Sequence, residues 1–315
     1  MDKGYGINPG LSGEGKVLVS RLMGLIRQSI GAVKLITNRR KEPFFSFGAL
    51  MKCAVKNGRP YPLTNYVDFK DLISVRQGKS FKFVKYDNEE YAYPVLWSDS
   101  ACIANLNAVL NEQINADSPH RYLSSDEIGH DWVIYDLGGA EGYQAKQWSK
   151  KARKVIIFEP SEEWHQSLRE TFNREIETGK VEILNIGLSD EERTIDDRGS
   201  KLHLMSLDTV VEKHRLPYPD YIKVDIEGEE ARFLSGAKRV LTESNAKRMD
   251  ICVYHRPKDY IDIPKALSIY KGNGSFSSGI IVFNRDGIVC GNYRRQYHPI
   301  FRRCLYRYDF RNGRE

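Results

Sequence analysis

Cysteine is scarce in this sequence, and none of it is paired. The five cysteines are scattered and odd in number, and no two form a C-x-x-C pair. This usage argues against a disulfide-stapled secreted scaffold and against a structural zinc site, and it indicates a reducing compartment. Long uncharged apolar runs are also missing. We find no secretory signal and no segment able to span a bilayer, so we expect a cytoplasmic protein. The scattered cysteines also lead us to expect no metal.

A strong charge excess is absent too. The net charge is +6 with a pI near 8.9, a mild basic bias that suits acidic partners without requiring them. The 41% hydrophobic and 29% charged content describes a globular protein of one large or two modest domains. Residues 16–41 predict a basic amphipathic helix. It could lie on the inner membrane face as a peripheral contact, or pack on its own domain or on a second subunit in a homo-oligomer.

The fingerprint of dinucleotide-binding proteins is not present either. An apolar segment, Trp132 to Tyr135, runs into a turn in which G-x-G-x-x-G would require glycine at position 137, which is Leu137. The pattern that fits is D-x-G-x-x-x-G, from Asp136 through Gly138 to Gly142. Glycines let a ligand approach the main chain beside a helix N-terminus, and an acidic side chain suits an ammonium group. The turn therefore favours S-adenosylmethionine over NAD.

The second predicted strand supports a bound nucleoside. Residues 155–158 are apolar and end at Glu159, which lies 23 positions after Asp136. An acidic residue about 20 positions along is where a carboxylate holds a ribose diol. The alternative is an ordinary strand, turn and helix of any α/β protein.

From residue 131 onward, predicted strands alternate with predicted helices. We expect strands at 133–136, 155–159, 181–186, 221–224 and 250–255, and helices at 143–150, 162–176 and 229–241. Such alternation predicts a parallel sheet covered on both faces, with ligands beyond the carboxyl ends of the strands. Four polar side chains fall at those ends: Asp136, Glu159, Asp225 and His255.

The fourth predicted strand runs into a second motif, Lys223-Val-Asp-Ile-Glu-Gly-Glu229. Methyl transfer requires an acceptor held in line and a group that accepts its proton. Asp225 or Glu227 could accept that proton or orient the acceptor hydroxyl, and His255 is the other candidate base. Two alternatives stay open: divalent-metal binding by the carboxylates and His255, and a buried salt bridge between Lys223 and Asp225.

The segment before this domain predicts an accessory α+β region. Residues 80–86 and 90–97 alternate apolar and polar side chains around a turn, which indicates a hairpin, and residues 101–114 read as a helix. A polar loop follows, with His120 and Arg121 as candidate substrate contacts or as a simple link to the core. We divide the chain into a tail with the basic helix (1–60), the accessory region (61–125, a possible acceptor-side cap) and the cofactor domain (126–315).

Together, these motifs resemble the FkbM family of S-adenosylmethionine-dependent methyltransferases. The resemblance covers roughly residues 118–310. It rests on five stretches: Ser118-Pro-His-Arg-Tyr122, Ile134-Tyr-Asp-Leu-Gly-Gly-Ala-Glu-Gly142, Phe158-Glu-Pro160, Ile222-Lys-Val-Asp-Ile-Glu-Gly-Glu229 and Tyr254-His-Arg-Pro-Lys-Asp259 with Ile263-Pro264. Gly139 departs from the alanine that is more usual there.

The resemblance implies a Rossmann-like class I methyltransferase fold with a mostly parallel seven-stranded sheet and helices on both faces. It also implies O-methylation of a hydroxyl on a sugar, polysaccharide or other glycan-like acceptor. Carried over by match, the cofactor-binding residues are Asp136, Gly138, Gly142, Glu159 and Pro160. Asp225, Glu227 and Gly228 would line the junction between cofactor and acceptor.

The C-terminal stretch, residues 293–314, mixes arginines with aromatic side chains. Such a mixture can grip phosphates and stack on rings, which keeps an RNA or protein methyltransferase as an alternative function. The simpler interpretation is an antiparallel last strand with a solvated arginine face, so we do not expect a nucleic acid partner. A further alternative is a cofactor-binding assembly protein without catalysis.

Overall fold

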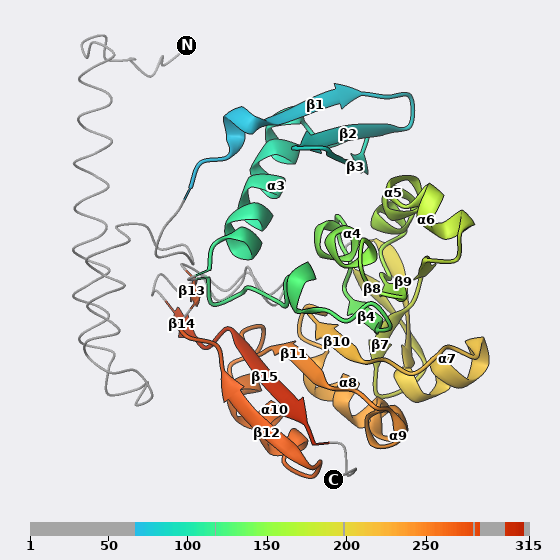
Figure 1. Ribbon diagram of the computed structural model, residues 1–315, viewed down its shortest axis with the longest axis vertical. Helices are drawn as coiled ribbons and strands as arrows, with labels where there is room; N and C mark the ends of the chain where they lie inside the picture. Colours follow the sequence, from blue (N-terminus) through green and yellow to red (C-terminus); the bar gives the residue numbers. More distant parts are fainter. Residues whose placement is uncertain (1–66, 117, 198, 280, 284–299, 312–315) are drawn as a thin grey trace, which may run out of the picture.

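A computed structural model describes residues 67–116, 118–197, 199–279, 281–283 and 300–311 of the chain (Figure 1). The predicted tail and basic helix within residues 1–60 lie outside these ranges. Within them, no helix combines the length and the hydropathy that crossing a membrane requires.

The centre of the molecule is a seven-stranded sheet with the strand order β12-β15-β11-β10-β4-β5-β6. Its strands are β4 (Val133–Leu137), β5 (Lys154–Phe158), β6 (Val181–Leu184), β10 (Tyr221–Val224), β11 (Arg248–Cys252), β12 (Gly272–Phe276) and β15 (Leu305–Phe310). The five strands from β11 to β6 are parallel, and β15 is antiparallel to both β11 and β12. The predicted α/β class with a mostly parallel seven-stranded sheet is confirmed.

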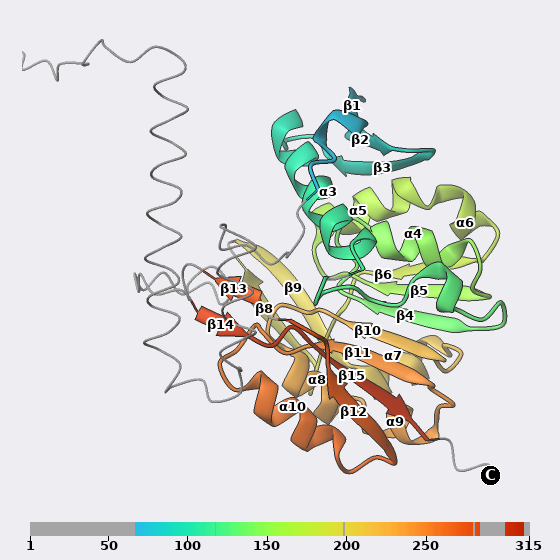
Figure 2. The same cartoon turned by 60° about the vertical axis from the view of Figure 1, so that its left-hand side comes forward.

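Helices cover both faces of this sheet (Figure 2). In β4, Val133, Tyr135 and Leu137 join one core cluster and Ile134 joins the other, as the two-residue period of a strand requires. The first cluster includes side chains of α7 (Leu207–His214), α8 (Glu230–Gly236), α9 (Lys238–Glu243) and α10 (Asp259–Leu267). The second includes side chains of α4 (Tyr143–Ser149) and α5 (Glu162–Thr171). Because both faces are covered, every residue of β4 is buried.

Two predicted helices are interrupted, and the strands predicted at 181–186 and 250–255 end early. The segment 162–176 forms α5 and then α6 (Asn173–Glu177), with a break at Phe172, and the segment 229–241 forms α8 and α9, with a break at Ala237. Both break residues are completely buried, so tertiary packing overrides the continuous helical pattern. Strand β11 ends at Cys252, so His255 lies three residues beyond the strand instead of at its end.

The accessory region is an antiparallel sheet backed by one helix. Strands β1 (Ile73–Gln77), β2 (Phe81–Tyr86) and β3 (Glu89–Pro94) follow the short 3-10 helix η1 (Lys70–Leu72), and α3 (Asp99–Ile114) follows them. Strands β2 and β3 form a hairpin in the segment where the sequence indicates one. Its buried side chains, among them Tyr91 and Tyr93, pack with those of α3 against Tyr143 of α4 and Trp164 of α5. The accessory region therefore sits on the α4 and α5 side of the domain (Figure 1).

Two small sheets were not predicted. Strands β7 (Gly187–Ser189), β9 (Ser200–Ser206) and β8 (Arg193–Asp197) form one in that order, and β13 (Ile281–Phe283) pairs with β14 (Ile300–Arg302) in the other. A second 3-10 helix, η2 (Ser125–Glu127), precedes β4.

Candidate active site

The turn after β4 lets its main chain approach the main chain after β10 closely. Gly138 has a φ of 82°, and a Cβ there would lie 1.9 Å from the carbonyl oxygen of Asp225. Gly142 has a φ of 81° and begins α4. Since only glycine combines positive φ with no Cβ, both positions require it. The turn thereby brings the end of β4 directly against the end of β10.

Asp136 anchors this turn through a lysine. Its carboxylate is 1% exposed, and its Oδ1 lies 2.9 Å from the Nζ of Lys223. The Lys223 ammonium also donates to the carbonyl oxygens of Leu137 and Gly138. Burial alone would lower the pKa of Lys223, but the Asp136 and Asp225 carboxylates outweigh it and raise that pKa.

The structure does not show the alternative of a salt bridge between Lys223 and Asp225, because the buried partner of Lys223 is Asp136. Asp136 as a cofactor-binding residue stays a prediction, and its buried carboxylate already pairs with the Lys223 ammonium. Asp136 therefore stabilises the turn through its ion pair with Lys223.

Glu159 ties the ends of β4 and β5 together. Its Oε2 accepts a hydrogen bond from the Ala140 N–H at 3.0 Å, and its Oε1 accepts one from the Ser161 N–H at 2.9 Å. Burial raises the pKa of Glu159, whereas these two amides lower it. The carboxylate is thus fixed beside the turn, with Pro160 next in the chain.

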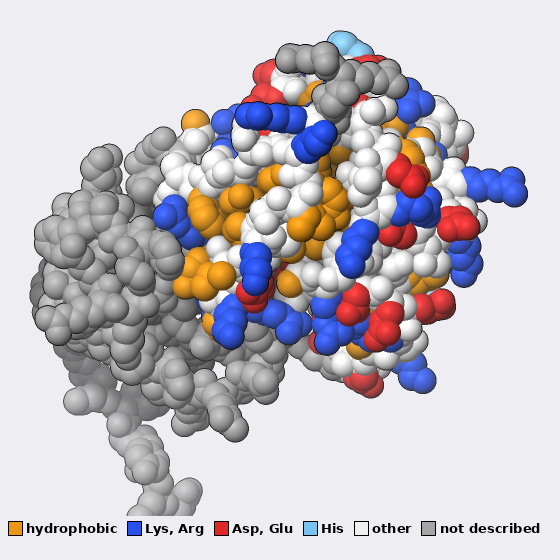
Figure 3. All heavy atoms as spheres, turned by 90° about the horizontal axis from the view of Figure 1, so that it is seen from below, with side chains coloured by type: hydrophobic (Ala, Val, Ile, Leu, Met, Phe, Trp, Pro, Cys, Tyr) orange, Lys and Arg blue, Asp and Glu red, His pale blue; other side chains and the backbone are white. Residues whose placement is uncertain are grey.

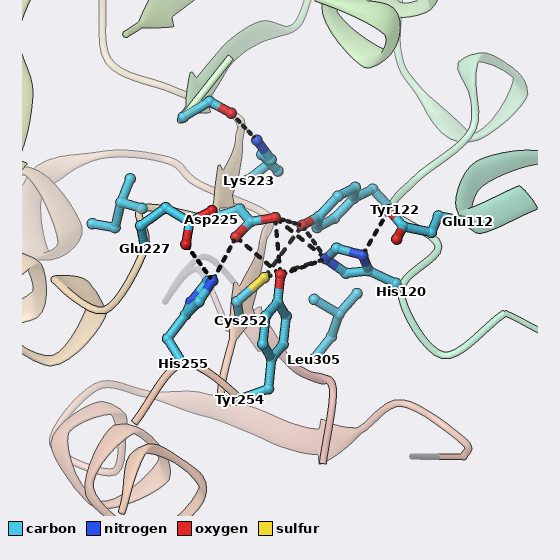
Figure 4. Close-up of polar contacts among 12 residues, drawn as sticks. Glu112, His120, Tyr122, Lys223, Asp225, Glu227, Cys252, Tyr254, His255 and Leu305 are labelled. Atoms are coloured by element: carbon cyan, nitrogen blue, oxygen red, sulfur yellow. Dashed lines mark hydrogen bonds and ion pairs between the residues drawn. The ribbon is translucent and has the colours of Figure 1, made fainter. Parts of the chain in front are cut away.

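Asp225, directly after β10, is the centre of a polar network (Figure 4). Its Oδ2 accepts from the Tyr122 hydroxyl at 3.0 Å and lies 3.3 Å from the Nε2 of His120. Its Oδ1 accepts from the Tyr254 hydroxyl at 3.2 Å and lies 3.4 Å from the Nε2 of His255. Burial would raise the pKa of Asp225, but the hydrogen bond from His120 and the charges of both imidazoles hold it well below its usual value. These neighbours favour the ionised form of Asp225.

Each of the two imidazoles lies between two carboxylates. His120 has its Nδ1 at 3.0 Å from Glu112, on α3, and its Nε2 near Asp225. His255 has its Nδ1 at 2.7 Å from Glu230, on α8, and its Nε2 near Asp225. Burial would lower both pKa values. The flanking carboxylates reverse this effect, raising the pKa of His120 well above its usual value and that of His255 to about 9. The raised pKa favours the protonated form of each ring, and the role of His255 as a general base stays a prediction.

Glu227 differs from the other two predicted catalytic residues. It has a φ of 55°, rare for a residue with a side chain, and its side chain is 83% exposed. Its Oε2 lies 3.5 Å from the Nε2 of His255. Desolvation by the protein around it is the largest influence on Glu227 and raises its pKa, the attraction of His255 opposes this, and the carboxylates of Asp225 and Glu230 add to it. The role of Glu227 as a catalytic residue stays a prediction.

Comparison with known proteins shows the family of this chain. Residues 136–270 match the family model described as the methyltransferase FkbM domain. The hexuronic acid methyltransferase AglP of Haloferax volcanii is 31% identical over 180 residues, which are 52% of this chain and 71% of that protein. The chain belongs to the FkbM methyltransferase family. It is therefore a methyltransferase, and the family implies use of S-adenosylmethionine.

Solved structures show weaker likenesses to this methyltransferase. The FkbM methyltransferase of Methylobacillus flagellatus KT is 21% identical with a TM-score of 0.43, covering 57% of this chain. The match spans only 44% of that longer protein. A precorrin-6y C5,15-methyltransferase of Geobacter metallireducens GS-15 is 9% identical with a TM-score of 0.39, covering 60% of this chain and 84% of its own.

The two predicted substrate contacts have other surroundings in the methyltransferase. His120 is buried between Glu112 and Asp225, so its ring is not free to bind an acceptor. The Arg121 carbonyl accepts a hydrogen bond from Arg307 Nη2 at 2.8 Å, which ties this loop to β15. Among the described residues, the Arg121 guanidinium makes no hydrogen bond to the network around Asp225.

Several members of the network were missed from the sequence. Tyr122 and Tyr254 adjoin predicted histidine positions, and both lie within quoted motifs, so a buried phenol beside each imidazole was a usable signal. Glu112, Glu230 and Cys252 carry no such signal. Glu112 lies in α3, Glu230 in α8 and Cys252 in β11. Only the tertiary structure brings them close to Asp225 or to the imidazoles of His120 and His255.

Two groups in this network have the spacing of metal ligands. They are Asp225 with Glu230 and His255, and Asp225 with His120 and Cys252. In both groups the imidazole lies between two carboxylates at ion-pair distance. Ion pairing is therefore sufficient to account for the spacing.

Proposed function

We propose that this methyltransferase transfers a methyl group from S-adenosylmethionine to a hydroxyl of a sugar or glycan acceptor. The observation that carries the proposal is the 31% identity with a hexuronic acid methyltransferase, over 71% of that relative. A hexuronic acid carries a negative charge, and the net charge of +6 on this chain suits an acidic sugar.

The residues around the glycine turn fit the cofactor. S-adenosylmethionine would supply a methyl group already activated on a sulfonium. Gly138 and Gly142 leave the main chain open beside the start of α4, where a side chain would collide with its neighbours. Glu159 presents a fixed carboxylate suited to ribose hydroxyls, with Pro160 beside it, and Asp136 holds the turn through Lys223.

The acceptor side divides its roles among three residues. Glu227 would take the proton from the acceptor hydroxyl, because it is exposed and its pKa is raised. Asp225 would orient the acceptor as an anion, and the two imidazolium rings hold it in place. His120 acts through Asp225, so it is a positioning residue and not a substrate contact.

The alternative of an RNA or protein methyltransferase rested on the C-terminal arginines. Its accompanying prediction of an antiparallel last strand is met by β15. Two of the arginines described there contact the protein itself: Arg302 donates to the carbonyl of His255 at 2.9 Å, and Arg307 donates to the carbonyl of Arg121 at 2.8 Å. On the face shown in Figure 3, basic side chains mix with acidic and hydrophobic ones. These contacts disfavour the alternative.

A labelled-methyl assay tests the proposal. The full chain is incubated with methyl-labelled S-adenosylmethionine and one of three acceptors: oligosaccharides containing hexuronic acid, neutral oligosaccharides of the same length, or RNA. We expect incorporation into a sugar acceptor, with the acidic one preferred. Incorporation into RNA alone, falling steeply with added salt, would replace the proposal with the nucleic acid alternative.

We also propose that the accessory region of β1 to α3 helps to form the acceptor side, because α3 supplies Glu112 to the network around Asp225.

The predictions of peripheral membrane contact and of a homo-oligomer rest on the helix predicted at residues 16–41, which lie outside the described residues.

A further inference from the structure

Arg256 is a charged residue beside the candidate active site to which no role has been assigned. It follows His255 in the loop after β11, within one of the stretches that carry the family resemblance. Two hydrogen bonds fix its backbone: its N–H donates to Asp259 Oδ2 at 2.6 Å, and its carbonyl accepts from the Asp259 N–H at 3.2 Å. Its side chain is 51% exposed. The loop therefore presents an accessible cation at a defined place.

The side chain of Arg256 is held against the turn that contains Glu227. Its Nε donates to the carbonyl oxygen of Gly228, and a Cβ on Gly228 would lie 3.1 Å from that Nε. His255, the neighbour of Arg256 in the chain, has its Nε2 at 3.5 Å from Glu227 Oε2 (Figure 4). The guanidinium is thus bonded to the residue next to Glu227, whose exposed carboxylate is the proposed base.

The positive charge of Arg256 is only partly balanced. Its ion-pair partner among the described residues is Glu229, at 3.3 Å from Nη2. That carboxylate also pairs with Arg193, and Asp190 pairs with both Arg193 and Arg232. In this group of ion pairs, three arginines share two carboxylates, so one positive charge is in excess. An exposed guanidinium with this excess charge can bind a carboxylate.

We propose that Arg256 is a specificity-determining residue that binds the carboxylate of an acidic sugar acceptor. This inference rests on the proposed function for the class of acceptor and for the role of Glu227. In an acidic sugar, the carboxylate and the hydroxyls belong to one small ring. A cation beside the base can therefore bind the carboxylate while the base takes the proton of a hydroxyl. The contact is a charge-assisted hydrogen bond from the guanidinium to the carboxylate.

Two acceptors that differ in one chemical group test this contact. The first is an oligosaccharide that contains hexuronic acid, and the second is the same oligosaccharide with its carboxyl groups reduced to alcohols. We would measure kcat/KM of methyl transfer to both with the full chain as wild type, Arg256→Gln, Arg256→Lys and Arg232→Gln. Arg232 is the matched control, because its side chain is 50% exposed and pairs with Asp190 at 3.6 Å in the same group of ion pairs.

The preference for the acidic acceptor is the ratio of the two kcat/KM values. Arg256→Gln should lower this ratio by about tenfold to a hundredfold, because a neutral amide replaces the charged donor. Arg232→Gln should keep the wild-type ratio. An unchanged ratio in Arg256→Gln overturns the inference. An equal loss in Arg256→Gln and Arg232→Gln also overturns it, since that result reflects only the general field of the surface.

Arg256→Lys separates the charge of this side chain from its shape. The variant keeps a cation, so it should keep more of the preference than Arg256→Gln does. Equal losses in the two variants would contradict a carboxylate contact. If the wild type methylates both sugars without preference, the inference fails while sugar methylation stands. If it methylates neither sugar, the proposed function fails and the inference fails with it.

Added salt provides a test that does not depend on a variant folding. Salt screens the attraction between exposed charges, so KM for the acidic acceptor should rise between about 50 mM and about 500 mM salt. KM for the reduced acceptor should change much less over the same range. Parallel salt profiles for the two acceptors would overturn the inference.

Discussion

Glu227 and Asp225 show how two carboxylates two residues apart acquire opposite properties. Four hydrogen-bond and ion-pair partners surround Asp225. Burial raises its pKa, but the two imidazoles and Lys223 outweigh this effect and lower it. Glu227 stands in the left-handed region with its carboxylate exposed, and its pKa is raised. Strained backbone conformations of this kind gather at functional sites. Under the proposed function, this difference assigns Asp225 to orienting the acceptor and Glu227 to accepting its proton.

Replacing Glu227 with Gln should reveal this division. We expect kcat to fall by about a hundredfold or more, because general bases typically contribute that much, while S-adenosylhomocysteine affinity is unchanged. Initial rates of methyl transfer and calorimetric titration measure the two quantities. The exposed variant Glu191→Gln is the matched control. A Glu227→Gln enzyme with full activity would show that the proton goes elsewhere.

The wild-type pH profile offers a second view of the same residue. A base must be unprotonated to act, so kcat/KM should fall as the pH drops through the pKa of Glu227. Since that pKa is raised, the acid limb should lie above the ordinary glutamate range of about 4.3.

At the scale of elements, α3 is the part of the accessory region that reaches the active site. Glu112, near its C-terminal end, holds the Nδ1 of His120, and His120 in turn holds Asp225. The family match begins at residue 136, so Glu112 and His120 lie outside the matched segment. A helix from the accessory region thus orients a residue of the methyltransferase sheet.

The variant Glu112→Gln should test the contacts from Glu112 through His120 to Asp225. The pKa of His120 should fall, because the carboxylate that raises it is gone, and NMR of the imidazole nitrogens would report the change. A less firmly held Asp225 should lower kcat by about tenfold, without altering S-adenosylhomocysteine affinity. A lower kcat with an unchanged His120 pKa would contradict the proposed positioning.

A feature of the fold could be predicted when the residues that determine it are close together in the sequence. The strand ends around Asp136, Glu159 and Asp225 could be predicted because apolar runs and turn residues are neighbours in the sequence. The breaks at Phe172 and Ala237 could not, since they follow from packing against a sheet that the local pattern does not describe.

The network around Asp225 was predictable only in part, for a similar reason. Its carboxylates and imidazoles come from α3, the loop before β4, the end of β10, the start of α8 and the loop after β11. The sequence nominates Asp225, His120 and His255 by residue type. It contains no local signal that Glu112 and Glu230 flank the two rings and raise their pKa values.

For the whole molecule, the buried imidazoles link stability to pH. The pKa of His255 is about 9 in the folded protein and about 6.5 in an unfolded chain. A raised pKa stabilises the fold fully below the unfolded value, and this contribution is lost as the pH rises through the folded value. We expect the free energy of unfolding to fall by roughly 3 kcal/mol between pH 6.5 and pH 9.5.

Urea denaturation across this range measures the slope. His255→Gln should flatten it, and His214→Gln, at an exposed position of α7, should leave it unchanged. An unchanged slope in His255→Gln would mean that the ring is neutral in the folded protein.

Strand β15 lies between β11 and β12, although it is made after both. While the chain is being synthesised, β11 and β12 therefore emerge from the ribosome with an open gap between them, and each presents unpaired backbone groups. Such edges attract foreign strands. Arg302, which holds the carbonyls of Tyr254 and His255, also emerges late. We therefore expect a chain truncated before residue 302 to be inactive and more prone to aggregate than the full chain.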